Sequence, residues 1–233
     1  MTGQLFKERF AYKESQCTII SDKSAAIQAA KESIKNNYIA LELYVRTNPK
    51  FLYTLTPIQA PYEPLVAKLM AEAANKADVG PMAAVAGAIA DLAVEDMLRV
   101  GCEVAVVEDG GEISAQSNQS VDVAAAVGDE PLSNCFGFRL TGFPIGVATS
   151  SRFSHALSFG DAEAAIVFCK NAVLADAAAT SVGNMVRGED AKAGIQAGIS
   201  RGLSIEGVEG VLIIYQGQVG TAGKIPEMIR IMQ

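Results

Sequence analysis

The strongest candidate pair for chemistry in this sequence is Asp176 and Thr180, which are four residues apart in an alanine-rich segment. This spacing puts both side chains on one face of a helix, one turn apart. A carboxylate and a hydroxyl are hard oxygen ligands, which suit Mg²⁺ or Ca²⁺ better than zinc. The pair could therefore bind a divalent metal. The spacing alone favours the structural alternative, a solvated aspartate and a threonine bonded to its own helix backbone.

A histidine and a run of hydroxyl residues precede this pair. His155 is the chain's single histidine, and its ordinary pKa is near neutrality, so we expect it to bond a ligand or move a proton. A Ser-His-Asp hydrolase with Ser150 or Ser151 as nucleophile is a competing possibility, although the Gly-x-Ser-x-Gly elbow is absent. A cysteine-histidine protease is disfavoured because no cysteine has an activating context.

The elements that must position these residues are predicted to be strand, loop, strand and helix. Residues 144–149 form a short apolar run that ends in hydroxyl residues, and residues 164–169 form a second run of strand length. From Asn171 the apolar pattern becomes helical, and the Asn171 side chain can cap the first turn. The helix that follows would carry the Asp-Thr pair.

Two glycine-containing segments could bring another group close to the backbone. Asp-Gly is a strong turn dipeptide, so Gly110 and Gly111 predict a hairpin turn, with ligand contact as a second use. The small residues Ala83, Gly87 and Ala88 predict close packing of one helix on another. Anion contact at that helix N-terminus is the alternative.

The order of elements along the chain is strands, helices, strands, helices, strands, which predicts an α+β (mixed α/β) layered fold in one domain, 1–233. We expect a hairpin over 4–21 and a helix capped by Ser21 or Asp22 that ends at Asn48-Pro49. An extended link is expected over Phe51–Leu55.

Composition excludes several classes of protein. The chain has 26 acidic and 19 basic residues, which argues against a general nucleic-acid binder. Its most apolar stretch, 82–94, is shorter than the roughly 20 residues that span a bilayer, so no membrane association is expected. The four cysteines form no Cys-x-x-Cys, which argues against zinc. With no signal peptide at the N-terminus, we expect a cytoplasmic protein.

These motifs together resemble the ApbE flavin transferases, Mg²⁺-dependent enzymes that move FMN from FAD onto a Ser or Thr of a target protein. The shared order is Ala-Thr-Ser-Ser (148–151), a histidine, a strand and Ala-Asp-Ala-Ala-Ala-Thr (175–180). Still closer is the resemblance to a small prokaryotic family related to ApbE. That resemblance covers most of the chain and is carried by the motifs at 79–90, 108–112, 149–151, 155–160 and 175–180.

The resemblance implies an ApbE-like layered fold and a pocket for FAD, FMN or a nucleotide. In that pocket Asp176 and Thr180 would hold Mg²⁺ against a pyrophosphate, and His155 and Asp176 would be catalytic. The residues implied around the cofactor are Gly110, Gly111, Thr149, Ser150, Ser151, Arg152 and His155.

Departures from the flavin transferases favour a related pocket over the same reaction. The Asp-Pro-x-x-Gly that usually follows their histidine is absent, and so is their Lys-Gly pair near Gly80-Pro81. The expected function is to bind a flavin or nucleotide with a divalent metal and to transfer or hydrolyse a phosphate-linked group. The alternatives are a non-catalytic small-cofactor binder and a structural homo-oligomer. The small-residue helix at 80–90 makes a homodimer the expected assembly.

Overall fold

The computed structural model describes residues 5–125, 136–153 and 158–231. The elements are β1 (Phe6–Tyr12), β2 (Ser15–Ser21), α1 (Ser24–Thr47), α2 (Pro49–Tyr53), α3 (Leu65–Ala77), a 3₁₀ turn η1 (Pro81–Ala84), α4 (Val85–Arg99), β3 (Val104–Asp109), β4 (Glu112–Ser117), β5 (Val121–Ala124), β6 (Phe136–Leu140), β7 (Ile145–Ser150), β8 (Ala164–Cys169), α5 (Ala172–Met185), α6 (Ala191–Ser204), β9 (Val208–Tyr215), β10 (Gln218–Gly223) and β11 (Glu227–Arg230).

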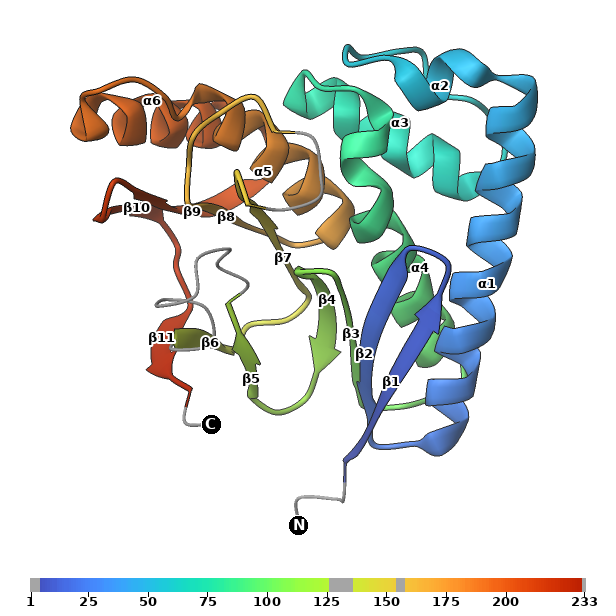
Figure 1. The fold of residues 1–233 in the computed structure, drawn as a ribbon. Coiled ribbons are helices and arrows are strands. Elements are labelled where there is room, and N and C mark those ends of the chain that lie inside the picture. The colour runs from blue at the N-terminus through green and yellow to red at the C-terminus, as the bar shows by residue number, and fades with distance from the viewer. Residues whose placement is uncertain (1–4, 126–135, 154–157, 232–233) are drawn as a thin grey trace.

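The strands form two antiparallel sheets, and the helices cover one face of the larger one (Figure 1). The larger sheet has eight strands in the order β1-β2-β3-β4-β7-β8-β9-β10. The smaller sheet, in the order β11-β6-β5, packs on its other face. The predicted α+β fold in layers is therefore confirmed.

Two apolar cores result from this layering. Strand β3 contributes to both: Ala105 and Val107 lie in the core under the helices, whereas Val104 and Val106 lie in the core between the sheets. Because β3 is buried on both faces, its sequence is almost continuously apolar rather than alternating.

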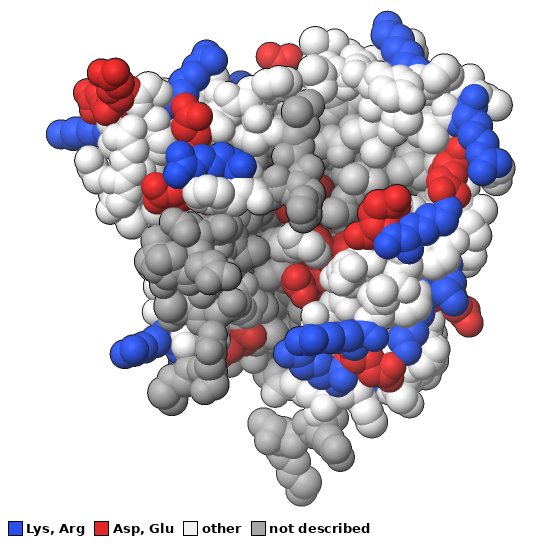
Figure 2. All heavy atoms as spheres, viewed as in Figure 1, with Lys and Arg blue, Asp and Glu red and all other residues white. Residues whose placement is uncertain are grey.

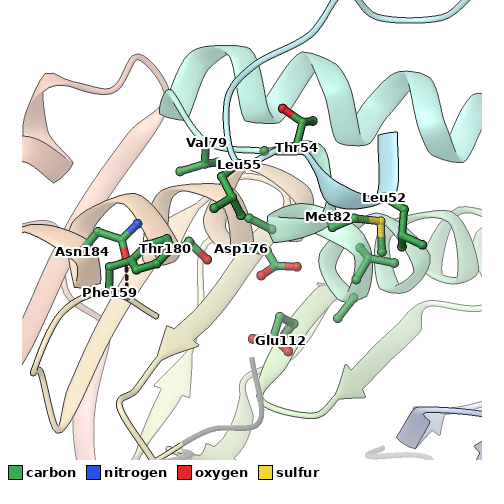
Figure 3. Close-up of a pocket in the computed structure, with 14 residues that line it drawn as sticks. Leu52, Thr54, Leu55, Val79, Met82, Glu112, Phe159, Asp176, Thr180 and Asn184 are labelled. Atoms are coloured by element: carbon green, nitrogen blue, oxygen red, sulfur yellow. Dashed lines mark hydrogen bonds between the residues drawn. The ribbon is translucent and has the colours of Figure 1, made fainter. Parts of the chain in front are cut away.

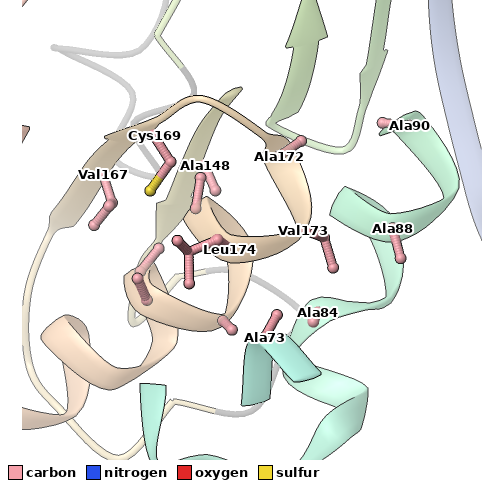
Figure 4. Close-up of a cluster of buried hydrophobic side chains, with 14 of the residues drawn as sticks. Ala73, Ala84, Ala88, Ala90, Ala148, Val167, Cys169, Ala172, Val173 and Leu174 are labelled. Carbon is pink, nitrogen blue, oxygen red and sulfur yellow. The ribbon is translucent and has the colours of Figure 1, made fainter. Parts of the chain in front are cut away.

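The helix-side core is dense in alanine where α4 and α5 meet (Figure 4). Gly87 of α4 makes the closest approach, since a Cβ at this position would lie 2.3 Å from the carbonyl oxygen of Ala172. The predicted close packing at Gly87 is confirmed, and it brings the first turns of two helices together.

Most local predictions from the sequence agree with the structure. The hairpin β1–β2 and the end of α1 at Thr47 are confirmed. The cap of α1 is a correction, because its N-cap residue is Lys23, and the Ser21 hydroxyl accepts the Lys23 N–H instead. The extended link over Phe51–Leu55 is also wrong, because α2 extends to Tyr53.

No single helix in the described part of the chain is long and apolar enough to cross a membrane. The pair Leu65–Ala77 and Pro81–Arg99 reaches the required length and composition only together, with a 103° bend between the two segments.

Candidate functional site

A cavity of about 400 Å³ opens between the start of α4, the first residue of β4 and one face of α5. Its volume is in the range of small-molecule sites. In the space-filling view this face of the molecule is hollowed near its centre, and acidic atoms are visible inside the hollow (Figure 2). The described residues that line the cavity are Leu52, Thr54, Leu55, Val79, Gly80, Met82, Ala83, Val85, Ala86, Glu112, Phe159, Asp176, Thr180 and Asn184.

One side of the cavity is a polar stripe along α5. Asp176, Thr180 and Asn184 recur every four residues and are partly exposed, whereas most other positions of the helix are buried. The helix starts at the predicted position, since the Asn171 side chain accepts the Leu174 N–H at 3.0 Å. The structure therefore brings Asp176 and Thr180 together on the cavity wall, as their spacing predicts (Figure 3).

The Asp176 carboxyl is held by another helix. Its Oδ2 accepts the Gly87 N–H at 2.9 Å, in the first turn of α4. The N-cap residue of α4, Ala84, provides no side-chain cap, so Asp176 supplies one from α5. Burial raises the pKa of Asp176 to about 7, although the Gly87 N–H favours the charged form. The Asp176 carboxyl therefore lies against the first turn of α4 and is not fully solvated.

The start of α5 is capped in the same way by an aspartate of α4. Asp91 of α4 accepts the Ala172 and Val173 N–H groups at 2.9 and 2.8 Å, and the Ser114 hydroxyl at 2.6 Å. Burial raises the pKa of Asp91, and these three donors oppose the rise. Each helix thus carries the aspartate that caps the other, which fixes the α4–α5 crossing beside the cavity.

Glu112 is a cavity residue that the sequence did not assign. It is the first residue of β4, and its carboxyl lies opposite that of Asp176 (Figure 3). Burial and the nearby negative charges of Asp176 and Asp109 raise the pKa of Glu112 well above its ordinary value. In the sequence, Glu112 is marked only as the acidic residue that follows Gly-Gly. Its position opposite Asp176 can be seen only in the fold.

The two glycines before Glu112 form the predicted turn. Gly110 and Gly111 connect β3 to β4 with φ of +68° and +119°, and Asp109 pairs with Glu112 across the hairpin. Neither glycine is among the described residues that line the cavity. The hairpin turn is confirmed, and ligand contact by these glycines stays a prediction.

The hydroxyl residues at the end of β7 do not all point the same way. Ser150 faces α5, since its Oγ is 2.9 Å from where a Cβ on Gly183 would lie. Neighbouring side chains on a strand point to opposite faces, so Thr149 faces away from α5. The buried Ser151 hydroxyl accepts the Phe153 N–H at 3.2 Å.

Arg152 is exposed, with its guanidinium 4.5 Å from the centre of the Phe153 ring. The described cavity lining includes neither Arg152 nor the hydroxyl residues 149–151. His155 lies outside the described residues, and so does the proposed Ser-His-Asp geometry.

The donor set of the cavity is made of oxygen. Among the described residues, no group of three or more His, Cys, Asp or Glu side chains is placed to hold a metal ion by itself. No lysine or arginine is among the described lining residues. A cation there would need the Thr180 hydroxyl, a backbone carbonyl or a ligand oxygen besides the carboxyls, which is the oxygen chemistry that Mg²⁺ prefers.

The chain is similar to known proteins over almost its whole length. UPF0280 proteins of Methanococcus vannielii and Methanosarcina acetivorans are 37% and 38% identical, over 97% and 96% of this chain and 94% and 89% of theirs.

Solved structures share the fold at low identity. A Pseudomonas stutzeri flavinyl transferase ApbE in its apo form has a TM-score of 0.58 at 13% identity, covering 94% of each chain. The ApbE protein of Thermotoga maritima has a TM-score of 0.58 at 12% identity, covering 97% of each chain. The family model described as "AbpE bacteria" matches residues 3–221. The chain therefore belongs to the AbpE bacteria family, whose fold is that of the ApbE flavin transferases.

Proposed function

We propose that the cavity binds a flavin or nucleotide together with a divalent cation, and that the protein is a Mg²⁺-dependent transferase or hydrolase of a phosphate-linked group. The family and the fold support a flavin-related activity, because two structures of similar fold are those of flavin transferases by title. Asp176 and Thr180, which the resemblance assigns to the metal, line the same cavity.

The observation that carries the proposal is the Asp176 carboxyl, hydrogen-bonded to the first turn of α4 with Thr180 one turn further along α5. Its carboxylate and the Thr180 hydroxyl would hold the cation, and no lysine or arginine in the described lining competes for them. When bound, Mg²⁺ would supply charge neutralisation at the phosphates of the ligand.

The rest of the lining would orient the ligand and exclude water. The Gly87 N–H fixes one oxygen of Asp176, so this carboxyl would keep its orientation as a ligand enters. Leu52, Leu55 and Met82 form an apolar wall that suits a flat ring. Phe159, whose backbone N–H donates to Asn184 at 2.9 Å, lies at the same cavity.

The remaining residues implied by the resemblance belong to the same proposal. His155 would move a proton or bond the ligand, and Arg152 would add positive charge near the phosphates. Contacts from Gly110, Gly111 and the hydroxyls of residues 149–151 would come from the rim, since none of them is in the described lining.

The test is incubation of the purified protein with FAD and Mg²⁺, with released FMN measured by chromatography and binding measured by thermal shift. We expect FMN release in the wild type and its loss in Asp176→Asn and Thr180→Val. Glu189→Gln, an exposed carboxyl outside the described lining, is the matched control.

Three other outcomes decide against this reaction. A flavin-dependent shift without FMN release would identify a non-catalytic binder. FMN release that survives both cavity substitutions would place the chemistry elsewhere. No shift with any flavin, nucleotide or divalent metal would overturn the proposed function.

A further inference from the structure

We propose that Glu112 is a second carboxylate ligand of this cation site, so that the ion lies between β4 and α5 and binds without the help of a nucleotide. This inference deepens the proposed function and rests on its metal site. It concerns a residue to which neither the sequence nor the family resemblance gave a role.

The direction of the Glu112 side chain follows from the strand pattern. Ser114, two residues further along β4, bonds to Asp91 on the helix side of the sheet. Ile113, between them, lies in the core on the other side. Side chains two apart on a strand share a face, so Glu112 points toward the helices and into the cavity (Figure 3).

The hairpin turn lies close to this carboxyl. A Cβ on Gly110 would lie 3.6 Å from Glu112 Oε2, which is an ordinary van der Waals contact. The backbone N–H groups of Glu112 and Thr149 favour the charged form of the Glu112 carboxyl. The groups that favour its charge are thus backbone groups rather than a basic side chain.

Two further acids near the cavity each accept two or more hydrogen bonds. Asp91 accepts three hydrogen bonds from Ser114 and the start of α5. Asp109 accepts the Ser15 hydroxyl at 2.5 Å and the Gln16 N–H at 3.0 Å. Glu112 and Asp176 are the two acids in the described cavity lining, and they face one another there (Figure 3).

Two facing carboxylates with no basic partner repel one another unless one is protonated or a cation lies between them. Their combined charge of about −2 matches one divalent ion, so the pair would neutralise it without a phosphate. With Asp176 alone, the same ion would keep a net positive charge in a largely apolar cavity. Glu112 therefore decides whether the metal binds before the nucleotide or only with it.

The test is a titration of the purified full chain with Mn²⁺ alone, in which the free ion is measured by electron paramagnetic resonance. We expect wild type to bind one Mn²⁺ and Glu112→Gln to bind it about 10-fold or more weakly, the cost seen when a metal site loses a supporting group. Asp176→Asn should weaken binding at least as much. Glu108→Gln, on the same hairpin but outside the described lining, should bind as wild type does.

A second measurement separates loss of a ligand from loss of the fold. Without metal, Glu112→Gln removes a repulsion, so its melting temperature should equal or exceed that of wild type while the rise on adding Mn²⁺ shrinks. Glu112→Asp keeps the charge and should recover part of that rise.

Two results would overturn the inference and leave the proposed function intact. In one, Glu112→Gln binds Mn²⁺ with an affinity within twofold of wild type, whereas Asp176→Asn does not bind the ion. The other is a wild type that binds Mn²⁺ only when FAD is added. Conversely, the protein could bind Mn²⁺ through Glu112 and bind no flavin. That result would support this inference and contradict the flavin activity.

Discussion

The α4–α5 crossing predicts that Gly87→Ala destabilises the protein, although alanine is the better helix former. A Cβ at position 87 would lie 2.3 Å from the Ala172 carbonyl oxygen and 2.9 Å from Asp176 Cβ. Carbon atoms in good contact are about 3.5–4 Å apart, so the helices would have to separate by about 1 Å. That movement would also stretch the Gly87–Asp176 hydrogen bond, which is 2.9 Å long.

The magnitude follows from three contributions. Overpacking against a backbone costs about 1–3 kcal/mol. A weakened hydrogen bond to a charged group costs about 1.5–3 kcal/mol. Alanine returns about 1 kcal/mol of helix propensity. We therefore expect unfolding free energy to fall by about 3 kcal/mol, which lowers the melting temperature by about 6–12 °C in a chain of this size.

The assay is urea unfolding followed by circular dichroism, with Gly198→Ala as the matched control. Gly198 lies in α6, and a Cβ there would meet the side-chain ends of Ile213 and Val186 at 2.6 and 2.7 Å. Both contacts are with side chains rather than with a backbone, so this variant should lose less stability than Gly87→Ala. A Gly87→Ala protein as stable as wild type, or a more damaging Gly198→Ala, would refute the reasoning.

Two further predictions concern the aspartates that the two helices exchange. Asp91→Asn should lower the unfolding free energy by about 2–4 kcal/mol in urea, because one amide oxygen cannot replace a carboxylate that accepts three hydrogen bonds; a loss below about 0.5 kcal/mol would contradict this. Burial raises the pKa of Asp176 from 3.8 to about 7, so its stabilising protonated form is fully present below pH 3.8 and is lost as the pH rises through 7. In EDTA, wild type should therefore lose more stability than Asp176→Asn between about pH 5 and about pH 8, and equal losses would be evidence against a buried Asp176.

Local patterns were sufficient for most of the fold. The Asn171 side chain caps its helix as the sequence predicts, accepting the N–H three residues later. The apolar runs predicted at 144–149 and 164–169 form the strands β7 and β8. Such signals depend on a few neighbouring residues, so they can be recognised in the sequence without knowledge of the fold.

The errors came from packing that the local pattern does not show. Phe51 is buried against Tyr44, with ring centres 5.1 Å apart, and this packing supports a short helix in a stretch predicted to be extended. The period of two along β7 could have shown that Thr149 and Ser150 face opposite ways. No local signal places Glu112 opposite Asp176, because the two residues are brought together only by the sheet order and the α4–α5 crossing.

The smaller sheet joins distant parts of the chain, which has a consequence for biosynthesis. Strand β6 pairs with β5 on one edge and with β11 on the other. On the ribosome, the first pair can form as soon as residue 140 emerges, but the second must wait for residues 227–230. During that interval one edge of β6 has no strand beside it, so a nascent chain stalled before residue 227 would be the form most open to capture by a chaperone.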